Sequence, residues 1–134
     1  MKTFESKTLD IAASQSRIYT YLADFRNFGE LMPSEITNWK ADATTCSFTI
    51  QNMADLNMGY GDSIPQEKII MKSQGKNPFD YDLNILIQNE NEDLSEVKIV
   101  FNADLNPMLA MMASTPLKNF INMLVEKLKE IMEG

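Results

Sequence analysis

The methionines carry the most distinctive side-chain chemistry in this sequence, which has 10 of them. Met108, Met111 and Met112 fall close together at the start of a long C-terminal helical pattern. Because methionine is unbranched and polarizable, it fits apolar surfaces of varied shape. The cluster therefore favours contact with an apolar ligand, and ordinary filling of the core is the alternative for each methionine taken singly.

Groups suited to catalysis are few, because the sequence contains no histidine and only one cysteine, Cys46. Histidine is the commonest general base and, with cysteine, the usual zinc ligand, so the usual catalytic triad and nearly all zinc chemistry are excluded. Cys46 alternates with Phe48 and Ile50 on one strand face, which predicts a buried thiol rather than a nucleophile. We expect no metal ion and no cofactor.

The paired carboxylates of the sequence fall where water reaches them. Asp80 and Asp82 lie opposite the apolar face of their strand, and Glu126 and Glu130 lie on the polar face of the C-terminal helix. The acidic segment 89–93 lacks the glycine and the ligand spacing of a calcium loop. Solvated surface is therefore the expected role of these carboxylates.

Two tyrosines are left as acid–base or hydrogen-bonding candidates. Tyr60 and Tyr81 belong to strand patterns in which the hydroxyl group either points inward to a ligand carbonyl or reaches solvent or the backbone. The sequence leaves both alternatives open.

Length and charge narrow the class of protein. A chain of 134 residues fits one domain, residues 1–134. A net charge of −7 with scattered basic residues is unsuited to binding nucleic acid. The longest apolar run, residues 108–113, is too short for stable membrane insertion, and the charges near the N-terminus do not fit a signal peptide. We expect a cytoplasmic location, and the oligomeric state is not readable from the sequence.

The elements that position these residues begin with a short strand over residues 8–11, where Leu9 and Ile11 alternate with polar residues. Two short helices follow, around Arg17 and Phe28, and Ser14 and Asp24 are their expected N-caps. This order predicts a pair of small helices between the first strand and the rest of a sheet.

A series of strands is predicted from residue 36 to residue 87. In the first of them, Thr37, Trp39 and Ala41 share one face, and a turn at 42–43 leads into the strand of Cys46. A hairpin is therefore expected here.

The last third of the chain predicts two long strands and one long helix. Apolar and polar residues alternate over residues 79–88 and 95–105, with an acidic turn at 89–93 between them. Asn106 then caps a helix with a continuous apolar stripe, which Pro116 is expected to kink or interrupt. The sequence thus predicts an α+β fold in which a curved sheet grips a terminal helix.

Several short segments give the whole chain a resemblance to the START-like superfamily, which includes pollen allergens and polyketide cyclases. They are residues 11–14 (IAAS), 21–24 (YLAD), 31–33 (LMP), 104–109 (DLNPML) and 116–117 (PL). The resemblance implies a helix-grip fold, with a seven-stranded antiparallel curved sheet around the C-terminal helix, two short helices between strands 1 and 2, and a hydrophobic tunnel. The sequence departs from the family at residues 41–44, which lack the glycine-rich turn of the allergens, and in having no histidine for cyclase chemistry.

The resemblance also implies which residues line that tunnel and contact a small hydrophobic molecule, lipid-like or polyketide-like, without covalent chemistry. The expected lining residues are Met32, Trp39, Phe48, Met58, Tyr60, Met71, Tyr81, Leu83, Phe101, Met108, Met111 and Met112. An empty pocket of about 300 Å³ would cost about 7 kcal/mol at roughly 24 cal/mol per Å³. The tunnel is therefore expected to be filled by a ligand, wet or partly collapsed.

Two other functions remain as alternatives. One is a cyclase or dehydratase in which Tyr60, Tyr81 or an inward carboxylate moves protons. The other is a protein-interaction module that uses an edge strand or an exposed Trp39.

Overall fold

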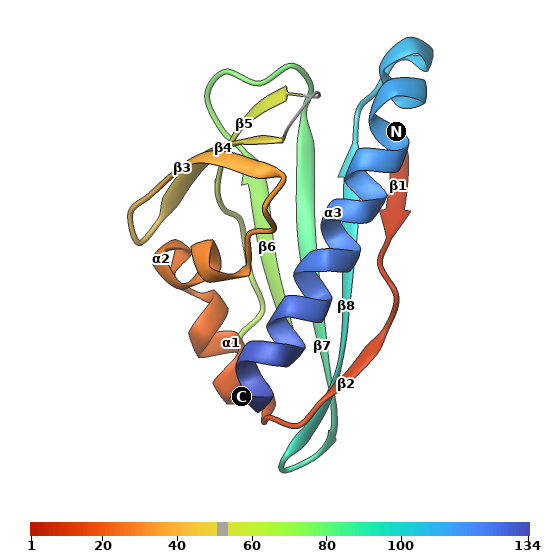
Figure 1. Cartoon of the computed structure of the whole chain (residues 1–134). Helices are drawn as coiled ribbons and strands as arrows, with labels where there is room; N and C mark the ends of the chain where they lie inside the picture. Colours follow the sequence, from red (N-terminus) through yellow and green to blue (C-terminus); the bar gives the residue numbers. More distant parts are fainter. Residues whose placement is uncertain (51–53) are drawn as a thin grey trace.

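The computed structural model describes residues 1–50 and 54–134 and shows a curved antiparallel sheet with one long helix across it (Figure 1). The elements in chain order are β1 (Lys2–Glu5), β2 (Leu9–Ile11), α1 (Gln15–Leu22), α2 (Phe25–Phe28), η1 (Gly29–Leu31), β3 (Ile36–Ala41), β4 (Thr45–Ile50), β5 (Ala54–Tyr60), β6 (Lys68–Ser73), β7 (Tyr81–Asn91), β8 (Leu94–Ala103) and α3 (Pro107–Glu133). The predicted α+β class and the sheet with a terminal helix are confirmed.

The sheet has the strand order β1-β8-β7-β6-β5-β4-β3, and β2 pairs with β8 beside β1. Eight strands therefore fill the seven expected positions, because the first strand is broken in two. At the break, the Ser6 N–H donates to the Ile99 carbonyl and the Ser6 hydroxyl accepts from the Ile99 N–H, both at 2.8 Å. This side chain satisfies the backbone of β8 where the ladder would otherwise be open.

Side chains cap the helices at the expected residues. Ser14 accepts a hydrogen bond from the Arg17 N–H at 3.1 Å, and Asp24 accepts one from the Arg26 N–H at 2.9 Å. Asn106 caps α3 through the Leu109 N–H, also at 2.9 Å. Each cap satisfies a backbone donor that the first helical turn leaves free.

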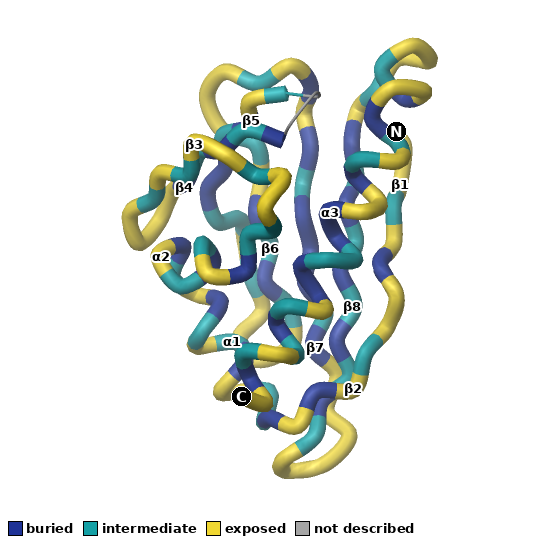
Figure 2. Tube along the Cα trace, viewed as in Figure 1, coloured by how far each residue is buried: buried dark blue, intermediate teal, exposed yellow. Residues whose placement is uncertain are grey.

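Helix α3 lies along one face of the sheet, closest to β8, β1 and β2 (Figure 1). Figure 2 shows its buried positions turned toward the strands. They are Ala110, Ala113, Leu117, Phe120, Ile121, Leu124, Val125, Leu128 and Met132. The helix runs without interruption through Pro116. Neither α3 nor any other described helix has the length and apolar character needed to cross a bilayer.

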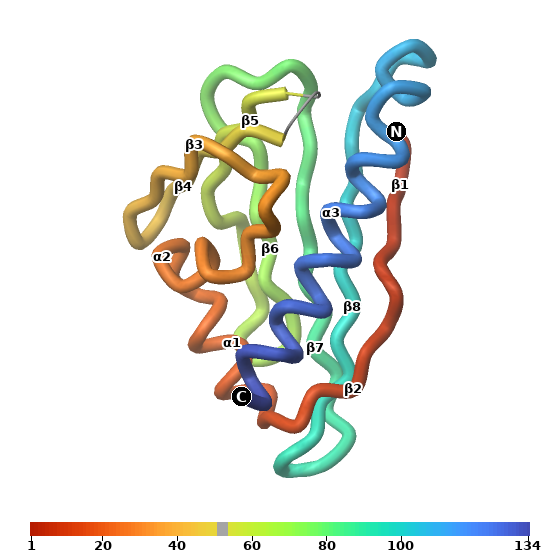
Figure 3. Tube along the Cα trace, viewed as in Figure 1, coloured from red at the N-terminus to blue at the C-terminus, as the bar shows by residue number. Residues whose placement is uncertain are grey.

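Hydrogen bonds join the C-terminal end of α3 to the region around the start of α1, and Figure 3 shows these two segments next to each other. The Arg17 guanidinium donates to the Met132 carbonyl at 3.2 Å, and the Ala12 N–H donates to the Glu133 carboxylate at 2.9 Å. These bonds satisfy groups at the helix end and fix its direction across the sheet.

A β-bulge makes one sequence prediction wrong. The register between β3 and β4 shifts between Thr37 and Lys40, and Asn38 has a positive φ of 56°. The extra residue turns Thr37 out to solvent, so that Ile36 and Trp39 face the core instead. Thr37 therefore does not share a face with Trp39.

Two strand boundaries also differ from the prediction. β7 continues to Asn91, so the turn into β8 is shorter than the expected segment 89–93. β8 ends at Ala103, two residues before the end of the alternating pattern. Pairing along most of the β7–β8 hairpin extends the first strand beyond what its side-chain pattern indicates.

Gly29 is required by a close contact with Trp39. A Cβ atom at position 29 would lie 2.4 Å from the indole Nε1, so alanine there must displace the ring. We expect Gly29→Ala to lower the free energy of unfolding by about 1–3 kcal/mol, in the range of other overpacking substitutions. Urea denaturation followed by circular dichroism measures this loss. In a Trp39→Phe background the smaller ring should relieve the clash, and an equal loss in both backgrounds would contradict the explanation.

Candidate functional site

The structure places the twelve expected lining residues in three different environments. Those in the core are Phe48, Met58, Met71, Tyr81, Leu83 and Phe101. Those half-buried and packed against it are Met32, Trp39 and Tyr60. Those exposed to solvent are Met108, Met111 and Met112. The exposed group lies on the solvent side of α3, apart from the other nine.

Aromatic rings join the sheet to α3 across the interior. Trp39 packs on Phe48 with ring centroids 5.9 Å apart, and Phe48 packs on Phe120 of α3 at 5.7 Å. Tyr81 stacks on Phe101 at 5.3 Å. These contacts pack distant parts of the expected lining against one another in the core.

Both candidate tyrosines donate to the backbone. The Tyr60 hydroxyl donates to the Leu22 carbonyl at 2.5 Å, and the Tyr81 hydroxyl donates to the Asn57 carbonyl at 2.9 Å. Burial raises the pKa of each phenol well above its ordinary value. Both hydroxyl groups therefore stay protonated at neutral pH, and the hydrogen of each is already engaged in a hydrogen bond to the backbone.

An apolar hollow of about 220 Å³ opens beside α3, where the connection from η1 meets the end of β4. Its lining residues are Pro33, Glu35, Ile36, Ile50, Pro116, Asn119, Phe120 and Met123. A second hollow of about 330 Å³ shares Pro33 and Met123 with the first and continues along the helix. It is lined in addition by Leu31, Met32, Ser34, Glu126, Lys127 and Glu130. We call the two together the α3 groove.

The α3 groove is apolar at one end and charged at the other. Helical spacing puts residues 116, 119, 120 and 123 on one face of α3, which forms the apolar wall. At the charged end, Lys127 lies 3.5 Å from the carboxylate of Glu130. Such a groove suits a molecule with an apolar body and a polar end.

Sequence reasoning found Met32 of the groove but missed most of its apolar wall. Phe120 belongs to the predicted apolar stripe of the helix, and Met123 follows it by three residues. That spacing was a usable signal. The sequence gives no signal that Ile36 and Ile50 belong to the groove, because only the pairing of β3 with β4 brings these two strand ends together.

Larger hollows lie elsewhere on the surface and are lined mostly by polar side chains. One of about 660 Å³ lies between the β3–β4 hairpin and the loop after β6, with Lys40 and Lys76 at its rim. Another of about 700 Å³ lies between residues 65–67 and 86–89. Small apolar ligands prefer concave, mostly apolar sites, so the α3 groove is the better candidate despite its smaller volume.

Comparison with known proteins identifies the architecture. The sequence matches no protein-family model and no curated protein. Many solved structures are similar to this chain, and three of them illustrate the likeness. The KanY protein is 13% identical, covers 100% of both chains and has a TM-score of 0.77. A START superfamily protein from Mycobacterium smegmatis is 16% identical, covers 98% of this chain and 97% of its own, and has a TM-score of 0.70.

The third is a point mutant of norcoclaurine synthase from Thalictrum, in complex with a transition-state analogue. It is 12% identical, covers 98% of this chain and 93% of its own, and has a TM-score of 0.72. The chain has the helix-grip fold of START-like proteins. At these identities the likeness establishes the fold alone.

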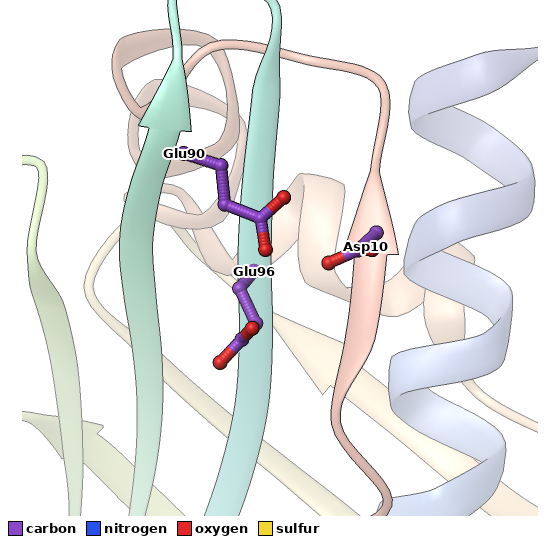
Figure 4. Close-up of side chains that lie close together, drawn as sticks. All are labelled: Asp10, Glu90 and Glu96. Carbon is purple, nitrogen blue, oxygen red and sulfur yellow. The ribbon is translucent and has the colours of Figure 1, made fainter.

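Outside the α3 groove, the fold brings three carboxylates together at one end of the sheet. Asp10 of β2, Glu90 of β7 and Glu96 of β8 have carboxylate oxygens within 4.8 Å of one another (Figure 4). A hydrogen bond to the Asp10 carboxylate, together with desolvation and the negative charges of Asp10 and Glu96, raises the pKa of Glu90 to about 7. The sequence predicts Glu90 in an acidic turn. Pairing of β2 with β8 brings Asp10, which is far away in the chain, next to Glu96 and so into the cluster.

This cluster predicts a pH-dependent loss of stability. Because the pKa of Glu90 is higher in the folded chain than its ordinary value of 4.5, the folded state binds the proton more tightly. The contribution of Glu90 to the free energy of unfolding therefore falls as the pH rises from 4.5 through about 7. We expect Glu90→Gln to raise the thermal midpoint above that of the wild type at pH 8 and to differ little from it at pH 4, as measured by calorimetry. Glu92→Gln is the control for the charge change, and equal pH profiles of the two variants would refute the prediction.

Proposed function

We propose that this START-like protein binds a small hydrophobic molecule, lipid-like or polyketide-like, in the α3 groove without covalent chemistry. One observation carries the proposal, which is the apolar hollow of about 220 Å³ between the edge of the sheet and α3. Its inner wall contains Ile50 and Phe120, whose side chains are already buried in the folded chain. The hollow is thus formed before a ligand arrives, which lowers the cost of ordering on binding.

The size of the apolar part limits the affinity that it supplies. Burial of apolar ligand surface contributes about 25 cal/mol per Å², from which the cost of association is subtracted, so a hollow of about 220 Å³ supplies only a limited free energy of binding. Tight binding therefore needs a polar end on the ligand as well. The side chains of Ser34, Lys127 and Glu130 at the charged end of the groove are the groups within reach for that contact.

The states of Cys46, Tyr60 and Tyr81 favour binding over covalent catalysis by these three groups. Burial, with a smaller effect of the Asp42 carboxylate, raises the pKa of the Cys46 thiol to about 12, so the thiolate is scarce at neutral pH. The phenols of Tyr60 and Tyr81 already donate to backbone carbonyls. These three groups are therefore poorly suited to attack or deprotonate a ligand.

The proposal is tested with medium-chain fatty acids, alcohols and anthraquinones as probes. A bound probe should raise the thermal midpoint of the wild type in proportion to its concentration and affinity. It should also change the fluorescence of Trp39, the single tryptophan, which contacts the groove through Phe48 and Phe120. Asn119→Phe fills the mouth of the hollow and should weaken binding by about tenfold or more, equivalent to about 1.4 kcal/mol.

Thr115→Phe is the matched control, because Thr115 is exposed on the same helix and is not among the residues that line the groove. The control should bind the probes like the wild type. If no probe shifts the midpoint, or if Asn119→Phe binds them as the wild type does, the groove is not the binding site.

A further inference from the structure

The three methionines at the start of α3 are among the most exposed apolar side chains of the described residues. Met108, Met111 and Met112 are 72%, 86% and 63% exposed. On the buried side of the same segment, Ala110 and Ala113 are 7% and 2% exposed. The buried side of α3 therefore includes the two alanines, and all three methionines lie on its solvent side.

The spacing of the three methionines lets their sulfur atoms converge. Residues three and four apart on a helix are neighbours, with Cβ atoms about 5–6 Å apart. Met108 is such a neighbour of both Met111 and Met112. The side chains have three rotatable bonds each and are largely free of packing, so they can turn toward a common point above Met108.

The segment that carries this methionine cluster contains no charged side chain. Residues 105–117 include neither a carboxylate nor a basic side chain. Neutral thioethers are soft ligands, which favour Cu(I), whereas carboxylates and water favour magnesium and calcium. The negative charge of the whole chain, −7, attracts cations from a distance.

We propose that Met108, Met111 and Met112 form a thioether site for a soft monovalent metal ion of the Cu(I) type. Each methionine supplies one sulfur atom, and solvent completes the coordination. The site lies outside the α3 groove and does not depend on the binding function proposed for it. These three methionines belong neither to the core nor to the lining of the groove.

Cys46 is the main competitor for a soft ion, since thiolates are stronger ligands than thioethers. Its thiol is buried, with 5% of the residue exposed. A Cys46→Ala background nevertheless removes the competition directly. All binding measurements are therefore made in full-length protein that carries this substitution.

The test uses Ag(I), an air-stable ion of the same charge and softness, with methyl-labelled methionine as the NMR reporter. We expect the methyl signals of Met108, Met111 and Met112 to shift and saturate at one ion per chain, while those of buried Met58 and Met71 stay in place. Native mass spectrometry should show one bound ion, and an anaerobic Cu(I) titration should reproduce the result. Excess Zn²⁺ should not displace the ion.

The decisive variant replaces all three with leucine, Met108→Leu, Met111→Leu and Met112→Leu, because leucine keeps the apolar character and the helix propensity. Circular dichroism checks that it folds. This variant should lose the bound ion, and the control Met32→Leu should keep it. Retention of one ion by the triple variant, or unsaturable shifts spread equally over Met1 and the cluster, would overturn the proposal.

Discussion

The packing of α3 on the sheet is the interaction on which the rest of the molecule depends. Nine buried residues line one side of this 27-residue helix, and a fully buried Leu or Phe stabilises a fold by about 1.5–3 kcal/mol. The helix lies closest to β8, β1 and β2, at one side of the sheet. Toward β4, the helix contacts the sheet through Phe120 and Phe48. The α3 groove lies beside this contact.

The sequence predicted one tunnel, whereas the structure has a packed interior and a separate groove beside α3. Methionines such as Met58 and Met71 fill the core, where their flexibility closes gaps that would otherwise cost stability. The open apolar space lies instead at the wall of α3. A START-like fold can thus keep a close-packed centre and still offer an apolar hollow at its edge.

Local signals predicted most of the fold, and long-range pairing decided what they missed. The Asn106 cap and the apolar stripe of α3 can be read from neighbouring residues. The bulge at Asn38 arises from pairing with β4, and the walls of the groove come from three segments far apart in the chain. The resemblance implied that Met108, Met111 and Met112 line a cavity, whereas Ala110 and Ala113, whose small side chains give only a weak hydrophobic signal, take the buried positions there.

The irregular course of β3 affects how copies of the protein meet one another. β3 is the last strand on its side of the sheet, where unpaired N–H and C=O groups form a template for another chain. The positive φ of Asn38 breaks the regular spacing of those groups, and the exposed Lys40 adds a charge beside the break. Edge-to-edge pairing with another copy is therefore disfavoured at this border of the sheet.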